Sequence, residues 1–143
     1  MIETTESPAA SLDCHLVRAG EAFQGKQGLM YAPAISAESV GARAIHMQLL
    51  TIPPGGRAKA HKHALHETAI YALSGTSHMW YGPRLEHRMV VEPGNFVYIP
   101  ADMPHLPYNP SQTESITAII ARTDPNEQES VVLLPDLEAL HPV

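Results

Sequence analysis

The spacing of proline and glycine is the feature that most limits what this chain can fold into. Thirteen prolines and nine glycines are spread at short intervals through 143 residues. Proline lacks a backbone N–H and glycine weakens regular structure, so the stretches between these breaks are too short for a long helix. The clearest breaks are the segments at 53–56, 74–75, 82–83, 93–94, 109–110 and 124–125. Helix is therefore expected to be minor.

Short apolar runs with strand character lie between these breaks. They cover residues 44–52, 68–73, 79–81, 89–91, 96–99, 116–122 and 131–134. Short strands between closely spaced turn signals favour an all-β sandwich or barrel. Residues 1–35 have weaker periodicity, and we expect an irregular or edge-strand arm there. The length is that of one domain, so we predict a single domain over residues 1–143.

Charge and composition exclude several classes of function. The formal net charge is −6, and the nine Lys and Arg residues are scattered, which argues against a nucleic-acid partner. No apolar run approaches the length of a membrane span, and residues 1–6 are acidic where a signal peptide would be basic. We therefore expect a cytoplasmic protein without a membrane partner. Cys14 is the one cysteine, which leaves no internal disulfide and no cysteine-based metal motif.

Histidines are concentrated in residues 60–75, AHKHALHETAIYALSG. In a strand, side chains two residues apart face the same way, so His61 and His63 can converge while Lys62 faces outward. Neutral imidazole binds Fe, Zn, Cu, Ni and Co, and the carboxylate of Glu67 would add a hard donor. His66 lies in the same turn, and we assign it an orienting hydrogen bond rather than a ligand role. His46 shares a strand face with Gln48, and either could line the mouth of a barrel.

A second motif follows at residues 94–109, an apolar strand that ends in a proline turn before His105 and Asn109. Together the two segments resemble the cupin superfamily. Its first motif is Gly, five residues, His-x-His, three or four residues, Glu, six residues and Gly, which here begins at Gly55. Its second motif is Gly, five residues, Pro, x, Gly, two residues, His, three residues and Asn. The paired match covers residues 55–109.

The match departs from the family pattern at two places. Asp102 replaces the glycine of the second motif, and aspartate tolerates a positive φ, so we expect the turn to survive. Seven residues rather than six separate Glu67 from Gly75. A β-bulge between Glu67 and Tyr71 would turn Glu67 inward; otherwise Thr68 lines the site and three histidines hold the metal. Both alternatives stay open at this point.

The resemblance implies an all-β double-stranded β-helix, a jelly-roll barrel with one divalent transition metal per subunit. His61, His63, His105 and Glu67 are the implied ligands, and Glu67 is also the implied catalytic group. Iron is our first choice of metal, with Mn, Ni, Co, Zn and Cu as alternatives. An open coordination position favours an enzyme. We predict a dioxygenase-like oxidoreductase; an isomerase or lyase, or a binding protein without turnover, are the alternatives.

Three further expectations concern the surroundings of the site. The basic residues near the motifs are Arg57, Lys59, Lys62, Arg84 and Arg88, and none is placed by sequence inside the barrel, so we expect a small neutral or singly charged organic substrate. The acidic segment TDPNEQES, residues 123–130, is typical of a solvated loop. Exposed strand edges need covering, and we expect a homodimer, as is common for cupins of this size.

Overall fold

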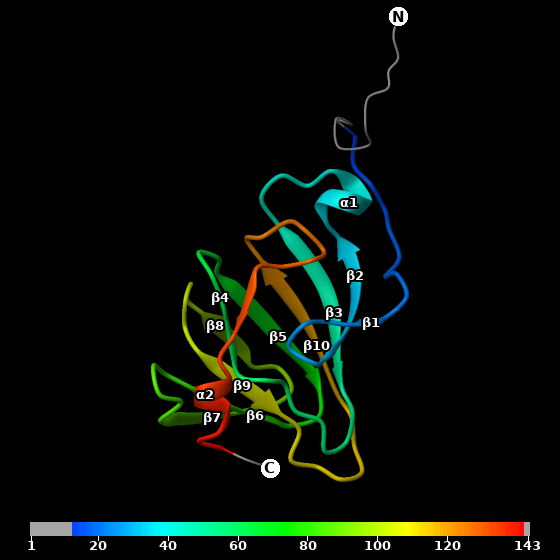
Figure 1. The fold of residues 1–143 in the computed structure, drawn as a ribbon. Coiled ribbons are helices and arrows are strands. Elements are labelled where there is room, and N and C mark those ends of the chain that lie inside the picture. Colours follow the sequence, from blue (N-terminus) through cyan, green and yellow to red (C-terminus); the bar gives the residue numbers. More distant parts are fainter. Residues whose placement is uncertain (1–12, 142–143) are drawn as a thin grey trace, which may run out of the picture.

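The protein is almost entirely β-structure, arranged as two antiparallel sheets that face each other (Figure 1). The computed structural model describes residues 13–141. Part of the predicted N-terminal arm, residues 1–12, lies outside the described residues. The prediction of an all-β jelly-roll barrel is confirmed. Across the described part of the chain, the helices are too short to cross a membrane.

The larger sheet has six strands in the order β1-β2-β3-β10-β5-β8. All its neighbouring strands are antiparallel. Its strands are β1 (Phe23–Gln24), β2 (Met30–Ile35), β3 (His46–Ile52), β10 (Ile116–Arg122), β5 (Thr68–Ser74) and β8 (Phe96–Ile99).

The smaller sheet has five strands in the order β11-β4-β9-β6-β7. Two short helices flank the sheets, α1 (Ala37–Val40) and α2 (Pro135–Glu138). The strands are β11 (Val131–Leu133), β4 (His61–His63), β9 (His105–Tyr108), β6 (Ser77–Tyr81) and β7 (His87–Val91).

Two central strands of the larger sheet, β3 and β10, bury every second side chain. Burial alternates strictly along β3 and along β10, which pair over their full length of seven residues. Apolar side chains on the inner faces form the core between the sheets, because burying them removes apolar surface from water. The buried members on the larger sheet include Leu50, Ile52, Ile116, Ala118 and Ile120.

The turn before β9 confirms what the second motif predicts. Asp102 has a φ of 63°, so aspartate occupies a left-handed position that usually favours glycine. Its backbone N–H donates to the carbonyl of His63 at 3.0 Å. This bond joins the turn that carries His105 to the end of β4, and so links the two histidine motifs.

Candidate metal centre

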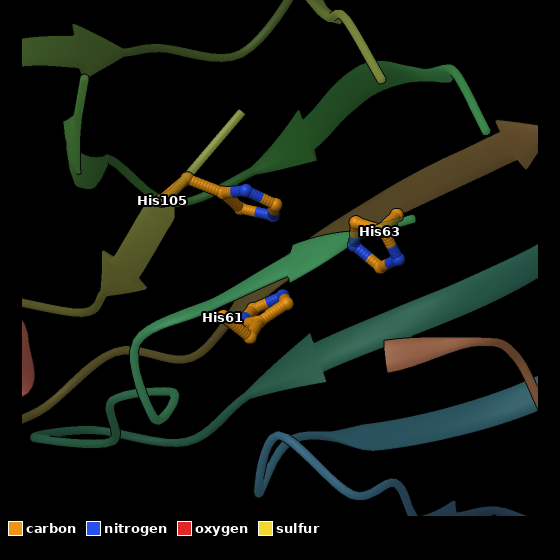
Figure 2. A group of neighbouring side chains, drawn as sticks. All are labelled: His61, His63 and His105. Carbon is orange, nitrogen blue, oxygen red and sulfur yellow. The ribbon is translucent and has the colours of Figure 1, made fainter. Parts of the chain in front are cut away.

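Two neighbouring strands of the smaller sheet bring three histidines together. His61 and His63 both face inward from β4, and His105 begins β9 directly opposite His61. Each of the three offers a ring nitrogen that lies within 4.8 Å of the other two. Figure 2 shows the three rings turned toward one another from the two strands. Within residues 13–141, these three histidines are the group of side chains spaced to hold a metal ion.

Oxygen atoms next to the three histidines orient their imidazole rings. The Nδ1 atoms of His61 and His105 donate to the carbonyls of Lys59, at 2.6 Å, and Met103, at 2.9 Å. The Nδ1 atom of His63 lies 2.8 Å from a carboxylate oxygen of Glu129. That contact is bent away from ideal hydrogen-bond alignment, so we treat it as an electrostatic one. A proton on Nδ1 leaves the Nε2 lone pair of each ring available to a metal.

Burial keeps the imidazoles of His61 and His105 neutral. Loss of solvent lowers the pKa of His61 well below its usual value, and the neighbouring His105 and His63 lower it further. Burial, followed by the proximity of His63, lowers the pKa of His105 to about 3. Metal ligation requires the neutral form of histidine, so the two side chains are already in the binding form at neutral pH.

Glu129 belongs to a buried polar cluster behind His63. Its Oε2 accepts from Nε2 of Gln27 at 3.1 Å and lies 3.7 Å from Nη1 of Arg122. Burial raises the pKa of Glu129, but the contacts with His63, Arg122 and Gln27 outweigh burial and lower the pKa to about 2. The carboxylate is therefore ionised at neutral pH and directed at the back of a candidate ligand.

This cluster corrects one expectation drawn from the sequence. The segment 123–130 is not simply a solvated loop, because the side chains of Asp124 and Glu129 are largely buried. A further cation, Arg122 at the end of β10, is buried and lines the cavity, although it was not among the basic residues considered from the sequence. Arg122 donates to the carbonyls of Asp124 and Asn126 and so holds this segment against the barrel.

Glu67 lies apart from the three histidines. Its side chain is on the exposed surface, where Oε1 accepts from the hydroxyl of Tyr98 at 3.1 Å. The next residue, Thr68, is buried, and its Oγ1 has no hydrogen-bond partner among the described residues. Thr68 lines the cavity that the three histidines also line. The geometry thus agrees with the alternative in which Thr68 occupies the usual carboxylate position.

The bulge in β5 lies further along the strand than the position that would turn Glu67 inward. Thr68 to Ala72 pair continuously with Arg122 to Ala118, and the register shifts only beyond Ala118. Ala118 faces Ala72 while Thr117 faces Ser74, which leaves Leu73 as the extra residue. Because the bulge follows Tyr71, it does not alter the direction of Glu67.

Two other histidines considered from the sequence have polar contacts of their own. The ring of His66 lies 3.5 Å from Oγ1 of Thr123 and 3.9 Å from Oδ2 of Asp124. His46 is fully buried, and its Nε2 lies 2.9 Å from Oε1 of Gln48. Of that pair, Gln48 lines the cavity.

The cavity between the sheets is small and mixed in polarity. Its volume is about 60 Å³, counted as the space that the centre of a water-sized sphere can occupy. A single water needs roughly 10–15 Å³ on that measure, so the cavity has room for several waters or for a small organic ligand. The wall carries both polar and apolar side chains. Besides the histidines, the polar members are Gln27, Gln48, Thr68, Ser77, Arg122 and Glu129, and the apolar ones include Leu50, Ile52, Met79, Val91 and Ile116.

Several solved structures share this architecture. A sugar phosphate isomerase, assigned provisionally, from Acidithiobacillus ferrooxidans is 24% identical, with a TM-score of 0.59 over 73% of this chain and 67% of that one. Oxalate decarboxylase from Bacillus subtilis is 20% identical, with a TM-score of 0.67 over 85% of this chain and 31% of that one. The enzyme of the same name from Lactobacillus farciminis is 18% identical, with a TM-score of 0.67 over 85% and 36%.

The chain thus spans about a third of the length of the two decarboxylases. At these identities the likeness shows a shared fold and does not transfer an activity. No curated protein matches the sequence significantly. A family model described as a cupin domain matches residues 48–120, just over half of the chain. This segment contains all three histidines of the candidate metal centre, and we conclude that the chain belongs to the cupin family.

Proposed function

We propose that His61, His63 and His105 bind one divalent transition metal per chain, and that the site acts on a small organic molecule in an oxygenase-type reaction. The observation that carries the proposal is the arrangement of three buried imidazoles, each with Nδ1 against an oxygen atom and each with a ring nitrogen within 4.8 Å of the other two. Neutral histidines paired at the back in this way are typical metal ligands. Three protein ligands would leave coordination positions open for substrate, as catalytic sites require.

The donor set is compatible with iron, which is our first choice of metal, and also with other metals. Three imidazole nitrogens suit Fe, Co, Ni, Cu and Zn, and manganese also occurs in this fold, since the Bacillus subtilis oxalate decarboxylase has Mn(II) centres. When bound, Fe(II) would supply a centre at which dioxygen and an oxygen- or sulfur-containing substrate can meet. Such chemistry obtains its reactivity from the metal and needs no strong base from the protein.

The contacts of two carboxylates, Glu129 and Glu67, separate this proposal from the isomerase and lyase alternatives. Those reactions move protons on and off carbon and need a group with a pKa near the working pH. Glu129 has a pKa of about 2 and is held by His63, Arg122 and Gln27. Glu67 is exposed and bound to Tyr98, so we do not carry its predicted ligand and catalytic roles into the proposal.

The cavity wall defines the substrate class. Its polar side chains can hold the chelating group of a ligand near the histidines, and its apolar side chains can enclose a short hydrocarbon body. Arg122 is the cation that lines the cavity, and its guanidinium already contacts Asp124, Asn126 and Glu129. A phosphate would require several free cations or N–H donors, so a neutral or singly charged molecule is the better fit.

Oxygen uptake tests the proposed reaction. The Fe(II)-loaded protein is assayed with a panel of small enols, catechols, β-diketones and thiols, with the His105→Asn protein as the control. We expect oxygen consumption with at least one class, abolished by the substitution. Conversion of a substrate without oxygen would indicate an isomerase or lyase. If a panel member binds tightly but is not converted when the protein carries Fe, Mn, Ni, Co, Zn or Cu, the result would indicate a binding protein.

The single domain over residues 1–143, the cytoplasmic location, the homodimer and the absence of a nucleic-acid partner stay predictions. They do not affect the choice among the reactions above.

A further inference from the structure

A groove opens on the outer side of the smaller sheet, across β9 from the candidate metal centre. His105 and Pro107 line the central cavity from β9, whereas the alternate residues Leu106 and Tyr108 line the groove. This division follows from the alternation of side chains along a strand. Trp80, which pairs with Leu106 from the neighbouring strand β6, also lines the groove. The groove and the cavity are therefore separate spaces that share β9 as a wall.

Segments from outside the sheet enclose the groove. α2 lies beside β9 and leads into His141 (Figure 1). The ring of His141 stacks on Trp80, with centroids 3.8 Å apart and planes 12° from parallel, and its Nε2 lies 2.9 Å from the carbonyl oxygen of Leu85. Gly55 and Gln112 line the groove from two loops. Its volume is about 330 Å³ on the measure that gives about 60 Å³ for the central cavity, so a small ring with its substituents fits here.

Arg57 places a cation without a carboxylate partner in the groove wall. The residue is half-buried, and its Nη1 donates to the carbonyl oxygen of His141 at 2.7 Å. Within residues 13–141, no carboxylate forms an ion pair with its guanidinium, and none of the residues that line the groove is Asp or Glu. Glu138, which lines an adjoining hollow with Arg57, accepts instead from the backbone N–H of Ala60. The remaining guanidinium N–H groups of Arg57 are thus available to an anion.

The aromatic wall of the groove lies next to a second cation. Arg88 on β7 donates from Nη1 to the hydroxyl oxygen of Tyr108 at 3.3 Å, and its guanidinium carbon lies 5.8 Å from the centre of the Trp80 ring. The same hydroxyl lies 3.1 Å from Nδ1 of His78. The groove is therefore locally positive, although the chain as a whole has a formal net charge of −6. Local positive charge of this kind attracts anions.

We propose that this groove is a second binding site, for a small organic anion that carries one carboxylate on a planar ring. The carboxylate would pair with the available N–H groups of Arg57, whose planar fork matches the geometry of a carboxylate. The ring would pack against Tyr108 and Trp80, because aromatic side chains offer large flat apolar surfaces. An inorganic anion would make only the first of these contacts, and a neutral ring only the second. The two contacts together define the ligand class.

Intrinsic fluorescence tests the proposal, because Trp80 is the one tryptophan of the chain and lines the groove. The full chain, with and without Zn²⁺, is titrated with benzoate at pH 7.5. We expect a saturable change in emission with a dissociation constant on the order of 1 mM, reasonable for a ligand of this size. Benzamide, which lacks the charge, and acetate, which lacks the ring, should each bind at least about 10-fold more weakly. Zn²⁺ should leave the response unchanged, since the groove is separate from the metal centre.

Arg57→Gln removes the cation and should weaken benzoate binding by about 10-fold or more, the effect of losing a charge-assisted hydrogen bond. Arg43→Gln is the matched control, because Arg43 is exposed and does not line the groove. Circular dichroism verifies that each variant is folded. If Arg57→Gln is not, Gln112→Glu replaces it, because it puts a negative charge on an exposed residue of the groove and should weaken benzoate binding by repulsion.

An emission that does not change up to about 20 mM benzoate would overturn the proposal. So would benzamide or acetate binding as tightly as benzoate, or equal benzoate affinities of the folded groove variant and the Arg43→Gln control. Metal affinity and oxygen uptake are separate readouts, and the groove variants should leave both unchanged. Failure of the proposed reaction and failure of the groove proposal are therefore distinguishable.

Discussion

The Nδ1 atom of His63 lies 2.8 Å from Oε1 of Glu129, a residue that comes from outside both histidine motifs. The segment that carries Glu129 leads into β11, where Val131 pairs directly with His63. This pairing brings the carboxylate to the back of the imidazole. Arg122 and Gln27 then hold the carboxylate in its ionised form.

Glu129→Gln should weaken metal binding by about 10- to 100-fold, the usual effect of removing a carboxylate that supports a histidine ligand. The neutral amide keeps the size of the side chain but no longer raises the basicity of His63. Competition with a chromophoric chelator for Zn²⁺ at pH 7.5 measures the affinity. Glu114→Gln, on an exposed loop, is the control and should leave the affinity unchanged. Equal affinities for the two variants would remove Glu129 from the account.

Glu67→Gln should retain one metal per chain with native affinity, because its carboxylate is exposed and bound to Tyr98. Tyr98→Phe removes the hydroxyl that donates to Glu67 and should also leave the metal content and affinity unchanged. Metal content after dialysis, together with the same chelator competition, checks both variants. Loss of metal from Glu67→Gln alone would restore the carboxylate to the ligand set.

The metal-free protein should lose stability in acid. The pKa values of His61 and His105 are lowered in the folded state from a usual 6.5, that of His105 to about 3. Between these values the unfolded chain binds more protons than the folded one, so the free energy of unfolding falls as the pH falls from about 7 toward 3. For His105 alone the loss is about 2 kcal/mol at pH 5. Glu129 adds a loss of the same sign below its usual pKa of 4.5.

Urea denaturation of the metal-free protein at pH 7.5 and pH 5 measures this dependence. His105→Asn removes one of the titrating groups and should flatten the pH dependence. A free energy of unfolding that stays constant between the two pH values would show that these histidines are not buried in their neutral form.

Much of the fold was predictable because its determinants are local. The alternation in residues 116–122 and the apolar run at 96–99 match β10 and β8 residue for residue. β2 and β9 were less apparent because each contains a proline, Pro33 and Pro107. Proline lowers the strand signal and is tolerated where no ladder bond is needed from its nitrogen.

The candidate ligand set was predictable only in part. The spacing of the two motifs identified His61, His63 and His105, and it showed that one residue is inserted after Glu67. Spacing cannot show where along a strand an insertion bulges, because that depends on the packing of neighbours such as β10. In the structure the bulge lies at Leu73. Leu73 follows Glu67 and Thr68 along the chain, so the bulge does not decide which of these two side chains faces inward.

Glu129 was missed because an acidic loop usually faces water. Its burial depends on the pairing of β11 with β4 and on the contact with Gln27, both of them long-range relationships. One signal was available: Glu129 lies two residues before Val131, the first residue of a short apolar strand. Alternation from that strand would direct residues 129 and 131 to one side.

X-ray absorption spectroscopy of the Zn²⁺- and Fe(II)-loaded protein tests the central claim most directly, because it counts the imidazoles around the metal. We predict one metal per chain with three histidine nitrogens, at about 2.0–2.1 Å for zinc. We also predict that Glu67→Gln leaves the spectrum unchanged, while His61→Asn removes one imidazole or the metal itself. A chain that binds no metal, or one whose metal is coordinated by fewer than three histidines, would contradict the account.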